Sequence, residues 1–379
     1  MRRVLVALPV VFTLSVEPLC HARLLFSREQ VDDWLAHVGA DDHFDAGKTI
    51  DWGLLPGPFY TPELGPGIGM ALAGIYRPTP GDRVSQNSTL SLSGYVSATG
   101  ATGINLSNYA FFAEDRWRFF LDGTVNNTPT YYWGQGFSAA GHDSRKQKYT
   151  AQGLRLRPVV YRQVTAHTWL GVGGSLDILH AAGTDSDNRL IKSTPQGISV
   201  ISSGVSLDLT RDTRDFAPNP RTGQLAELHY TRYSPETGSD TRFEAYTLHY
   251  SHYRPFGESS VLAWELNGDF TQGDVPWSSL PLLGDSRRMR GYYEGRYRDK
   301  NVVSGQIEIR RRLNWRHGIV AWAGTGTMAP EFHKLSRSRW LPSVGAGYRF
   351  EFKLRMNVRL DYGVGRGSSG FYFQVGEAF

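Results

Sequence analysis

The chain has 379 residues, a formal net charge of +5 and a single cysteine, Cys20. After the N-terminal segment, no apolar run is long enough for a membrane-spanning helix, so a membrane-embedded form would have to be a closed β-barrel, which pairs its backbone polar groups within the sheet. The length suits one large barrel or two ordinary domains, and the small net charge gives no indication of nucleic-acid binding.

Residues 1–22 are predicted to be a secretory signal peptide. Arg2 and Arg3 form a basic start, residues 4–16 are apolar, and small residues at Cys20 and Ala22 suit cleavage after Ala22. The apolar stretch is too short for a membrane anchor. Cys20 leaves a lipoprotein signal open as an alternative, although the residue before it is not small. Cleavage after Ala22 would leave a mature protein without disulfides.

Residues 23–50 form an N-terminal segment with one predicted element, an amphipathic helix over 27–38. Ser27 and Gln30 make a capping box at its start. Four apolar residues lie at i, i+3, i+4 and i+7 and therefore share one face: Val31, Trp34, Leu35 and Val38. Two roles remain open. The helix packs as a plug against the end of the barrel, or it lies at the interface or in the lumen and gates a pore or contacts a partner.

Residues 51–379 are predicted to form an all-β fold, a 16-stranded antiparallel transmembrane β-barrel. The candidate strands span 53–61, 67–77, 88–99, 103–113, 116–126, 147–163, 167–181, 196–211, 222–234, 241–253, 259–272, 302–313, 318–328, 341–352, 355–364 and 368–379. In 302–313, Ile307 and Ile309 alternate with Glu308 and Arg310. A charge facing lipid costs about 2–4 kcal/mol near the midplane, so the charged set is expected to face the lumen.

The connections between these strands support an even count. If the first strand rises from the periplasm, the long connections (127–146, 182–195, 273–301 and 329–340) all lie outside, and short turns such as 114–115 lie inside. Outer-membrane barrels have short periplasmic turns and long external loops. A soluble β-sandwich array is the alternative, but it does not explain the last strand.

The last predicted strand, 368–379, ends on an aromatic residue. Phe371, Phe373 and Val375 alternate with small or polar residues, so one face would meet lipid and the other the lumen. Phe379 is expected to mark the membrane edge.

No catalytic or metal-binding motif is recognised. The sequence contains neither Gly-x-Ser-x-Gly nor His-Glu-x-x-His. We therefore expect no cofactor and no metal, and we predict that the protein is not an enzyme. Several arginines are expected in the lumen, where they would favour anions: Arg155, Arg157, Arg310, Arg312 and Arg359.

Three segments resemble motifs of the BamA/TamA superfamily of outer-membrane assembly and secretion barrels, and the resemblance spans roughly residues 50–379. The first resembles the Arg-Gly-aromatic motif of the sixth extracellular loop, with Arg290, Gly291 and Tyr292. The second resembles a periplasmic turn motif, with Asp212, Arg214, Asp215, Pro220 and Gly223. The third resembles the C-terminal assembly signal, with Phe371, Phe373, Gly376 and Phe379.

The resemblance implies that Arg290 inserts into the lumen and pairs with an aspartate on the thirteenth strand. That strand carries no acid at the expected place, so we expect Glu308 as the partner, with Asp361 as second choice. The alternative is an ordinary solvated loop arginine. For the turn motif, a structural role as a rigid reversal is expected, and contact with a periplasmic partner is the alternative.

The resemblance also implies a function: insertion or translocation of proteins, or lipids, at the outer membrane of a Gram-negative bacterium. The protein looks like a short member that lacks the POTRA domains. Pro56 and Pro58 lie in the first strand and cannot donate to the sheet, so the seam between the first and last strands is expected to be weak and to open sideways. A passive, anion-preferring channel and a structural or dimerisation barrel derived from a patatin-type fusion remain as alternatives.

The partners expected from this interpretation are outer-membrane lipid, including lipopolysaccharide, the barrel assembly machinery for the protein's own insertion, and a client or periplasmic protein. No nucleic-acid partner is expected, and the oligomeric state stays open.

Overall fold

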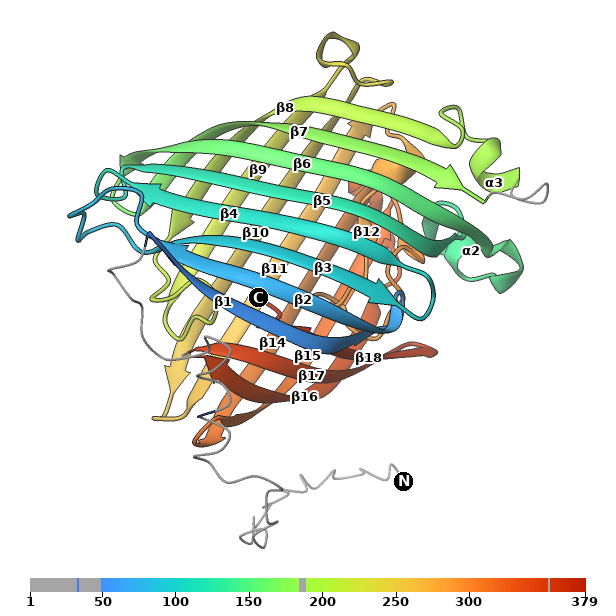
Figure 1. Ribbon diagram of the computed structural model, residues 1–379. Coiled ribbons are helices and arrows are strands. Elements are labelled where there is room, and N and C mark those ends of the chain that lie inside the picture. The colour runs from blue at the N-terminus through green and yellow to red at the C-terminus, as the bar shows by residue number, and fades with distance from the viewer. Residues whose placement is uncertain (1–32, 34–48, 184–188, 354) are drawn as a thin grey trace, which may run out of the picture.

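The computed structural model describes residues 33, 49–183, 189–353 and 355–379. These residues form a closed antiparallel barrel of 16 strands (Figure 1), which confirms the predicted fold class. The predicted signal peptide and the predicted helix 27–38 lie outside the described residues, apart from Asp33. In the described part of the protein, no helix has the length and hydropathy needed to cross a membrane.

The barrel strands follow one another around the wall in sequence order. They are β1 (Ile50–Thr61), β2 (Gly65–Tyr76), β3 (Ser88–Ser97), β4 (Thr102–Phe112), β5 (Trp117–Tyr132), β6 (Gln147–Thr165), β7 (Thr168–Ala182), β8 (Ser199–Asp212), β9 (Gly223–Tyr233), β10 (Phe243–Phe256), β11 (Ser260–Gly273), β14 (Asn301–Asn314), β15 (His317–Ala329), β16 (Leu341–Lys353), β17 (Met356–Gly365) and β18 (Ser368–Val375).

The remaining elements lie in the connections. A two-stranded ribbon is formed by β12 (Leu282–Leu283) and β13 (Tyr297–Arg298), between β11 and β14. The short helices are α2 (Gly136–Ala140) and α3 (Arg189–Lys192), and the 3-10 turns are η1 (Asp143–Arg145), η2 (Pro235–Thr237), η3 (Trp277–Ser279) and η4 (Phe332–Arg337).

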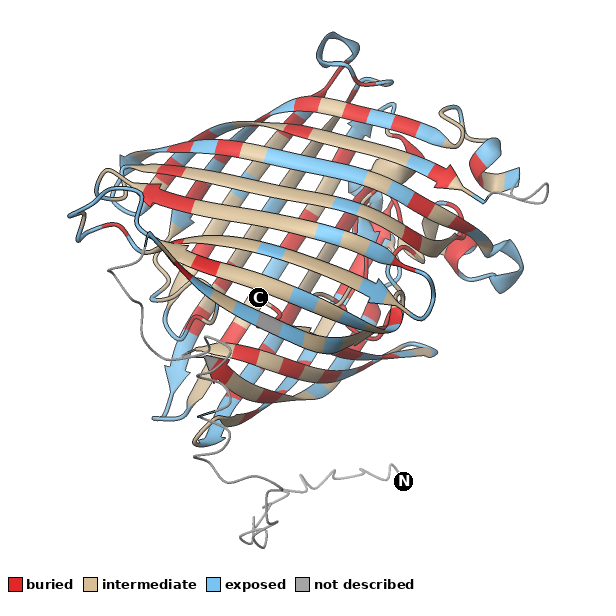
Figure 2. Ribbon diagram, viewed as in Figure 1, coloured by how far each residue is buried: buried red, intermediate tan, exposed pale blue. Residues whose placement is uncertain are grey.

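The two faces of the wall follow the predicted alternation. On β14, Ile307 and Ile309 are exposed on the outside, whereas Glu308 and Arg310 are buried on the lumen side. Buried and exposed positions follow one another along the strands in Figure 2. Because successive side chains of a strand point to opposite faces, the outer wall becomes an apolar belt and the charges gather inside.

The C-terminal end differs from the prediction. The last strand ends at Val375 rather than at residue 379, and Gly376 adopts a φ of +91°, which favours glycine. The backbone turns inward there, and the Phe379 ring lies 6.2 Å from the ring of Tyr253 and 5.1 Å from the guanidinium carbon of Arg310. Phe379 therefore lies in the lumen, and the expectation that it marks the membrane edge is wrong.

The seam between β1 and β18 is the weakest junction of the barrel. Its register pairs a single position, Tyr60 with Phe373. By contrast, β1 and β2 pair over their whole length, from Ile50–Tyr76 to Thr61–Gly65. The barrel is thus closed in outline, but one of its junctions is hardly paired.

Candidate functional site

The connection between β11 and β14 carries the predicted loop motif. At its tip, Asp285 Oδ1 accepts hydrogen bonds from the backbone N–H groups of Arg287 (2.5 Å) and Arg288 (2.6 Å). Met289 and Gly291 then take left-handed φ angles of 51° and 107°. An aspartate that caps the amides two and three residues ahead favours a tight turn over a strand. The residue between the two left-handed positions, Arg290, is thereby turned into the lumen.

Arg290 is fully buried and paired with two carboxylates. Its Nη1 lies 2.6 Å from Asp361 Oδ2 and its Nη2 lies 2.7 Å from Glu308 Oε2, and both acids are also fully buried. The guanidinium carbon lies 3.5 Å from the centre of the Trp322 ring. The planar fork of arginine suits two carboxylates and a ring face at once. The structure therefore brings together Arg290 and both predicted partners, while the thirteenth strand supplies an aromatic ring in place of an acid.

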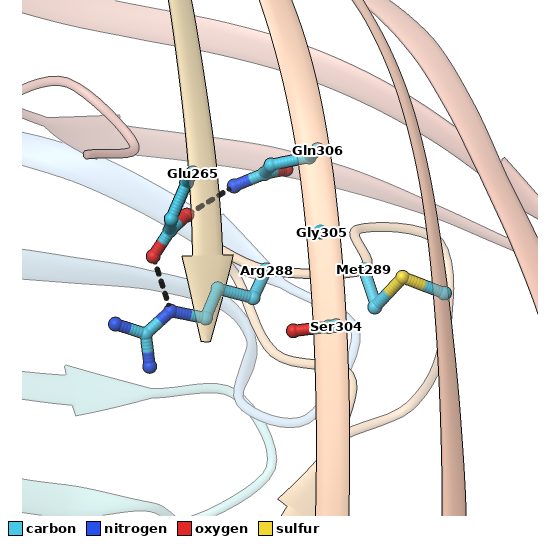
Figure 3. Close-up of a pocket in the computed structure, with 6 residues that line it drawn as sticks. All are labelled: Glu265, Arg288, Met289, Ser304, Gly305 and Gln306. Carbon is cyan, nitrogen blue, oxygen red and sulfur yellow. Dashed lines mark hydrogen bonds and ion pairs between the residues drawn. The ribbon is translucent and has the colours of Figure 1, made fainter. Parts of the chain in front are cut away.

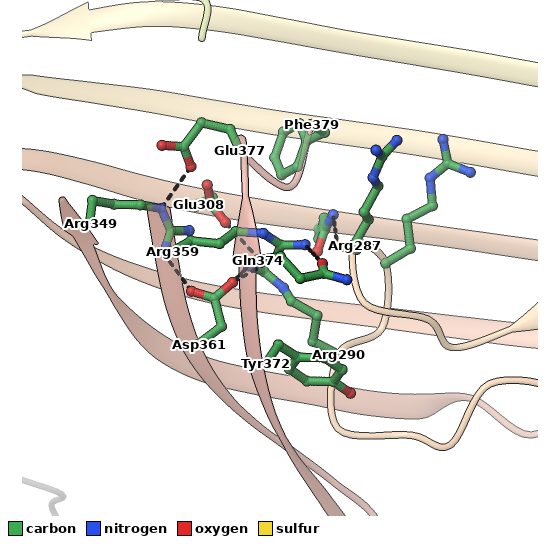
Figure 4. Close-up of polar contacts among 12 residues, drawn as sticks. Arg287, Arg290, Glu308, Arg349, Arg359, Asp361, Tyr372, Gln374, Glu377 and Phe379 are labelled. Carbon is green, nitrogen blue, oxygen red and sulfur yellow. Dashed lines mark hydrogen bonds and ion pairs between the residues drawn. The ribbon is translucent and has the colours of Figure 1, made fainter. Parts of the chain in front are cut away.

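These groups belong to a larger network, the arginine cluster, and Figure 4 labels its members apart from Arg310. It consists of Arg290, Arg310, Arg349 and Arg359 with Glu308, Asp361 and Glu377. Arg310 Nε lies 2.7 Å from Glu308, Arg359 Nη1 lies 2.9 Å from Asp361, and Arg349 bridges Asp361 (2.5 Å) and Glu377 (2.8 Å). A buried charge is tolerated only when it is paired. The cluster thus fixes the loop to β14, β16 and β17 and to the tail after β18.

Gly291 and Tyr292 make the close approach of the loop to the wall possible. The Gly291 N–H donates to the Tyr372 hydroxyl (2.8 Å), and a Cβ on Gly291 would lie 2.8 Å from the carbonyl carbon of Gly363. Only glycine fits this gap and this φ. The Tyr292 hydroxyl donates to the Pro342 carbonyl oxygen (2.6 Å). The loop backbone therefore lies directly on the backbone of β17.

A second anchor of the loop, which was not among the predicted site residues, is formed by Arg288 and Glu265 (Figure 3). Arg288 Nε lies 2.6 Å from Glu265 Oε1, and Gln306 Nε2 donates to Glu265 Oε2 (2.7 Å). His249 Nδ1 lies 3.3 Å from the same carboxylate. A signal was present, because Glu265 stands on the polar face of an alternating strand, where a buried acid requires a cation.

The loop also touches both sides of the seam. The Glu294 N–H donates to Glu63 Oε1 (2.8 Å) in the β1–β2 turn, and the Ser368 hydroxyl of β18 donates to the Gly291 carbonyl oxygen. Burial raises the pKa of Glu63, while the hydrogen bond from Glu294 lowers it by a smaller amount. The loop therefore contacts both sides of the β1–β18 seam. It bridges them at the end of the barrel that holds the β1–β2 turn.

The periplasmic turn motif is held by its own ion pairs. Arg214 donates from Nε to Asp212 Oδ1 (2.9 Å) and from Nη2 to Asp212 Oδ2 (2.9 Å). Asp215 accepts from the backbone N–H of Arg221 (2.9 Å) and pairs with Arg355 Nη2 (2.7 Å). Pro220 is buried, and Gly223 has a φ of +94°. Arg355 was not predicted from the sequence, because it lies in the β16–β17 turn, far from the motif.

Of the predicted C-terminal signal, Phe371 lies on the outer face and is exposed, and Phe373 pairs with Leu360 and Tyr60 on the same face. Gly376 and Phe379 instead belong to the inward tail described above. Across the described residues, no group of three or more His, Cys, Asp or Glu side chains could hold a metal ion. The contacts that hold the loop are ion pairs and close backbone contacts.

Removal of the Tyr372 hydroxyl tests the contact between loop and β18. The variant Tyr372→Phe leaves the buried Gly291 N–H without an acceptor, which is expected to lower the free energy of unfolding by about 1–3 kcal/mol. Chemical unfolding in detergent measures the change. Tyr362→Phe, at an exposed position of β17, is the matched control. Equal stability of the two variants would contradict the contact.

Comparison with known proteins identifies the family. Residues 81–379 match the Omp85 superfamily domain. The fold is similar to that of BamA from Haemophilus ducreyi lacking POTRA domains 1–3, with a TM-score of 0.54 and 15% identity over 91% of this chain and 77% of that chain. It is also similar to CdiB from Escherichia coli, with a TM-score of 0.58 and 12% identity over 87% of this chain and 63% of that chain.

CdiB from Acinetobacter baumannii gives a TM-score of 0.55 and 11% identity over 87% of this chain and 60% of that chain. The protein therefore spans less than two thirds of the length of either CdiB. No curated protein sequence matches it. At these identities the solved structures establish the fold alone, and the sequence match establishes the family. The protein belongs to the Omp85 superfamily, as the resemblance to BamA/TamA barrels implies.

Proposed function

We propose that this barrel inserts proteins into the outer membrane, or passes them across it, by opening sideways between β1 and β18. The observation that carries the proposal is the register of this seam, which pairs Tyr60 with Phe373 and no other residues. Each of the other neighbouring pairs of barrel strands is paired at eight positions or more.

An unpaired strand edge in the hydrocarbon core of the membrane is energetically unfavourable, and it can pair with another strand. Each unsatisfied N–H or C=O group in the bilayer core costs several kcal/mol. Such an edge can pair with an incoming strand, which supplies the missing hydrogen bonds. Pro56 and Pro58 have no N–H to give, so β1 cannot be fully paired on both sides. The seam therefore supports a role in strand exchange.

The strands β14, β16 and β17, on the β18 side of the seam, are held together and would form a rigid frame during opening. The arginine cluster joins β14, β16 and β17 through buried ion pairs. Opening must therefore separate β18 from β1, and it must break either the Glu294–Glu63 hydrogen bond or the loop's contacts with Tyr372 and Ser368. These loop contacts therefore contribute to the free energy that is needed to open the seam.

The family supports the location and the partners. Omp85 homologues are outer-membrane proteins of Gram-negative bacteria, and in such a membrane the long connections of this barrel would face outward. We propose outer-membrane lipid, the assembly machinery and a client or periplasmic protein as partners, and no catalytic role.

A disulfide across the seam tests the proposal. Residues directly opposite in an antiparallel pair have Cβ atoms about 4.5–5.5 Å apart, near the range of a disulfide, so Tyr60→Cys with Phe373→Cys is expected to lock the seam. The readout is the quantity of outer-membrane and secreted proteins, measured by proteomics in cells that carry only this copy. We expect a loss of clients that a reductant restores.

The matched control is Tyr362→Cys with Phe371→Cys, a directly opposed pair on the well-paired β17–β18 junction. This control lock is expected to leave client levels unchanged. Normal client levels with an oxidised β1–β18 seam would rule out sideways opening and would favour the channel or the structural barrel.

A further inference from the structure

The two edges of the seam, β1 in blue and β18 in red in Figure 1, differ in what they offer to an incoming strand. At one end of β2, the Pro66 carbonyl oxygen accepts a hydrogen bond from the Ala98 N–H (2.8 Å), so the even-numbered residues of β2 point their backbone groups toward β3. Because these directions alternate along a strand, the odd-numbered residues of β2 hydrogen-bond with their odd-numbered partners on β1. The even-numbered residues of β1, including Pro56 and Pro58, therefore face the seam.

The seam-facing edge of β18 carries a donor at every position. The Gly376 N–H donates to the Asn357 carbonyl oxygen (2.7 Å), which continues the β17–β18 pairing, so the even-numbered residues of β18 point toward β17. The odd-numbered residues point toward the seam, and each of them has an N–H group: Ser369, Phe371, Phe373 and Val375. On β1, by contrast, proline occupies two neighbouring seam-facing positions in the middle of the strand.

The tail after β18 ties this strand to the rigid frame of β14, β16 and β17. Glu377 Oε2 lies 2.8 Å from Arg349 Nε of β16, and Glu377 Oε1 accepts a hydrogen bond from Asn357 Nδ2 of β17 (2.5 Å). Arg310 Nη2 of β14 donates to the Phe379 carbonyl oxygen (2.6 Å). Together with the contacts between the inserted loop and β18 described above, these bonds make β18 a part of the frame.

The β1 side of the seam is held by fewer contacts. The inserted loop reaches it through the hydrogen bond from the Glu294 N–H to Glu63 in the β1–β2 turn (2.8 Å). In the register set by Tyr60 and Phe373, the part of β1 before Pro58 extends past the end of β18. Opening that breaks the Glu294–Glu63 hydrogen bond and moves the β1–β2 hairpin therefore disrupts fewer contacts than opening that moves β18.

We infer that β18 is the edge that receives an incoming strand, and that β1, whose Pro56 and Pro58 face the seam, is the edge that moves away. This inference rests on the proposed sideways opening and specifies what the opening accepts. A strand that paired along the whole of β1 would have two carbonyl groups opposite proline, without a donor, and an unsatisfied carbonyl in the hydrocarbon core is energetically costly. Along β18, every seam-facing residue can both donate and accept.

The chemistry of β18 describes the partner as a transmembrane β-strand of stated direction. Its seam-facing residues Phe371 and Val375 are exposed on the outer face, whereas Gly370 and Tyr372 are buried on the lumen side. The partner therefore needs apolar side chains on its outer face and small or polar ones toward the lumen. Antiparallel pairing is slightly more stable than parallel pairing, so the strand runs opposite to β18, as β1 does.

Photocrosslinking of a synthetic strand tests which edge receives it. p-Benzoylphenylalanine replaces Phe371 on β18, Leu54 on β1 or Leu92 on β3, three outward positions with exposed fractions of 43%, 43% and 44%. The probe is a peptide copy of residues 50–61 in which valine replaces both prolines, added to the purified full-length protein in lipid nanodiscs. We expect position 371 to capture at least about tenfold more peptide than position 54, because two additional hydrogen bonds are made there. Position 92 lies on a strand that is paired on both sides and should capture no more than a scrambled peptide gives.

Restoring the missing donors tests the role of the two prolines. The double variant Pro56→Ala/Pro58→Ala gives β1 an N–H group at every seam-facing position and is expected to raise peptide capture at position 54 about tenfold, to the level at position 371. Pro255→Ala, at an exposed proline of β10 away from the seam, is the matched control and should leave the ratio unchanged. Equal capture at positions 371 and 54 in the unaltered barrel, or a ratio that the double variant does not change, would overturn the assignment.

A failure of this inference can be told apart from a failure of the proposed function. Greater capture at position 54 than at position 371 would make β1 the receiving edge, and it would leave sideways opening intact. The disulfide between Tyr60→Cys and Phe373→Cys tests the opening itself, in cells and for either edge. Capture at neither position would overturn the assignment of β18, while the effect of that disulfide on client levels would still decide whether the seam opens.

Discussion

Replacing Arg290 with alanine is expected to lower the free energy of unfolding of the barrel by about 3 kcal/mol and to release the loop from the lumen. Removal of one partner from a buried ion pair typically costs about 3–5 kcal/mol, because it leaves an uncompensated charge. We expect the lower end of this range, since Glu308 keeps Arg310, and Asp361 keeps Arg349 and Arg359. Thermal unfolding in detergent gives the stability, and limited proteolysis of residues 274–300 gives the position of the loop.

Two further substitutions show that the geometry of Arg290 is decisive. Arg290→Lys keeps the charge but offers one ammonium group, which cannot hold Glu308 and Asp361 in the same way. We expect an intermediate loss. Arg287→Ala removes an exposed arginine three residues away and is expected to change stability by less than about 0.5 kcal/mol. If Arg290→Ala resembles Arg287→Ala, the loop does not depend on the arginine cluster.

Gly363→Ala is expected to displace the loop without touching any ion pair. A Cβ at Gly363 would lie 2.7 Å from the carbonyl carbon and oxygen of Arg290 and 2.9 Å from the backbone nitrogen of Gly291. Backbone atoms cannot move aside as a flexible side group can, so overpacking of about 1–3 kcal/mol or withdrawal of the loop must follow. The same proteolysis experiment measures it, and the loop should be cut as readily as in Arg290→Ala.

Gly94→Ala is the matched control for this substitution. Gly94 also lies in a barrel strand, but a Cβ there would have a single neighbour, the Gly103 carbonyl oxygen at 3.8 Å. No release of the loop is expected. An intact, protected loop in Gly363→Ala would mean that the loop does not lie on β17.

The barrel itself could be predicted because its signals are local. Alternation within single strands, such as Ile307 and Ile309 against Glu308 and Arg310, requires nothing beyond the two-residue period of a strand and the cost of charge in lipid. Loop lengths then indicated an even count. The resemblance to BamA/TamA barrels implied that Arg290 inserts into the lumen. Its pairing with Glu308, or with Asp361 as second choice, then followed from the requirement that a buried guanidinium meet a carboxylate on the polar face of a strand.

The features that were missed involve particular partners that neither the alternation of a strand nor a recognised motif identifies. Phe379 continues the pattern of the last strand, but the inward turn at Gly376 and the contact with Arg310 place it in the lumen. Arg355 meets Asp215 across 140 positions of sequence, and Glu265 meets Arg288 across 23. Strand alternation shows that Glu265 faces the lumen and needs a cation, but it does not show which cation, because the curvature of the closed sheet decides which side chains meet.

The loop motif and the seam are mechanically connected in this structure. Arg290 anchors the loop to β14 and β17, and from this anchor Gly291 reaches β18 while Glu294 reaches the β1–β2 turn. A barrel whose seam is poorly paired is therefore held together at one end by its own inserted loop. Variants that release the loop should also ease the separation of β1 from β18.

Hydrogen exchange of the backbone amides in the folded barrel tests the central claim, that one junction is weak and the others are firm. In β15, which is paired on both sides, the amides should remain protected. In β1 and β18, the amides that point toward the seam should exchange about tenfold faster or more, because few of them are paired. Protection of β1 and β18 equal to that of β15 would contradict the account.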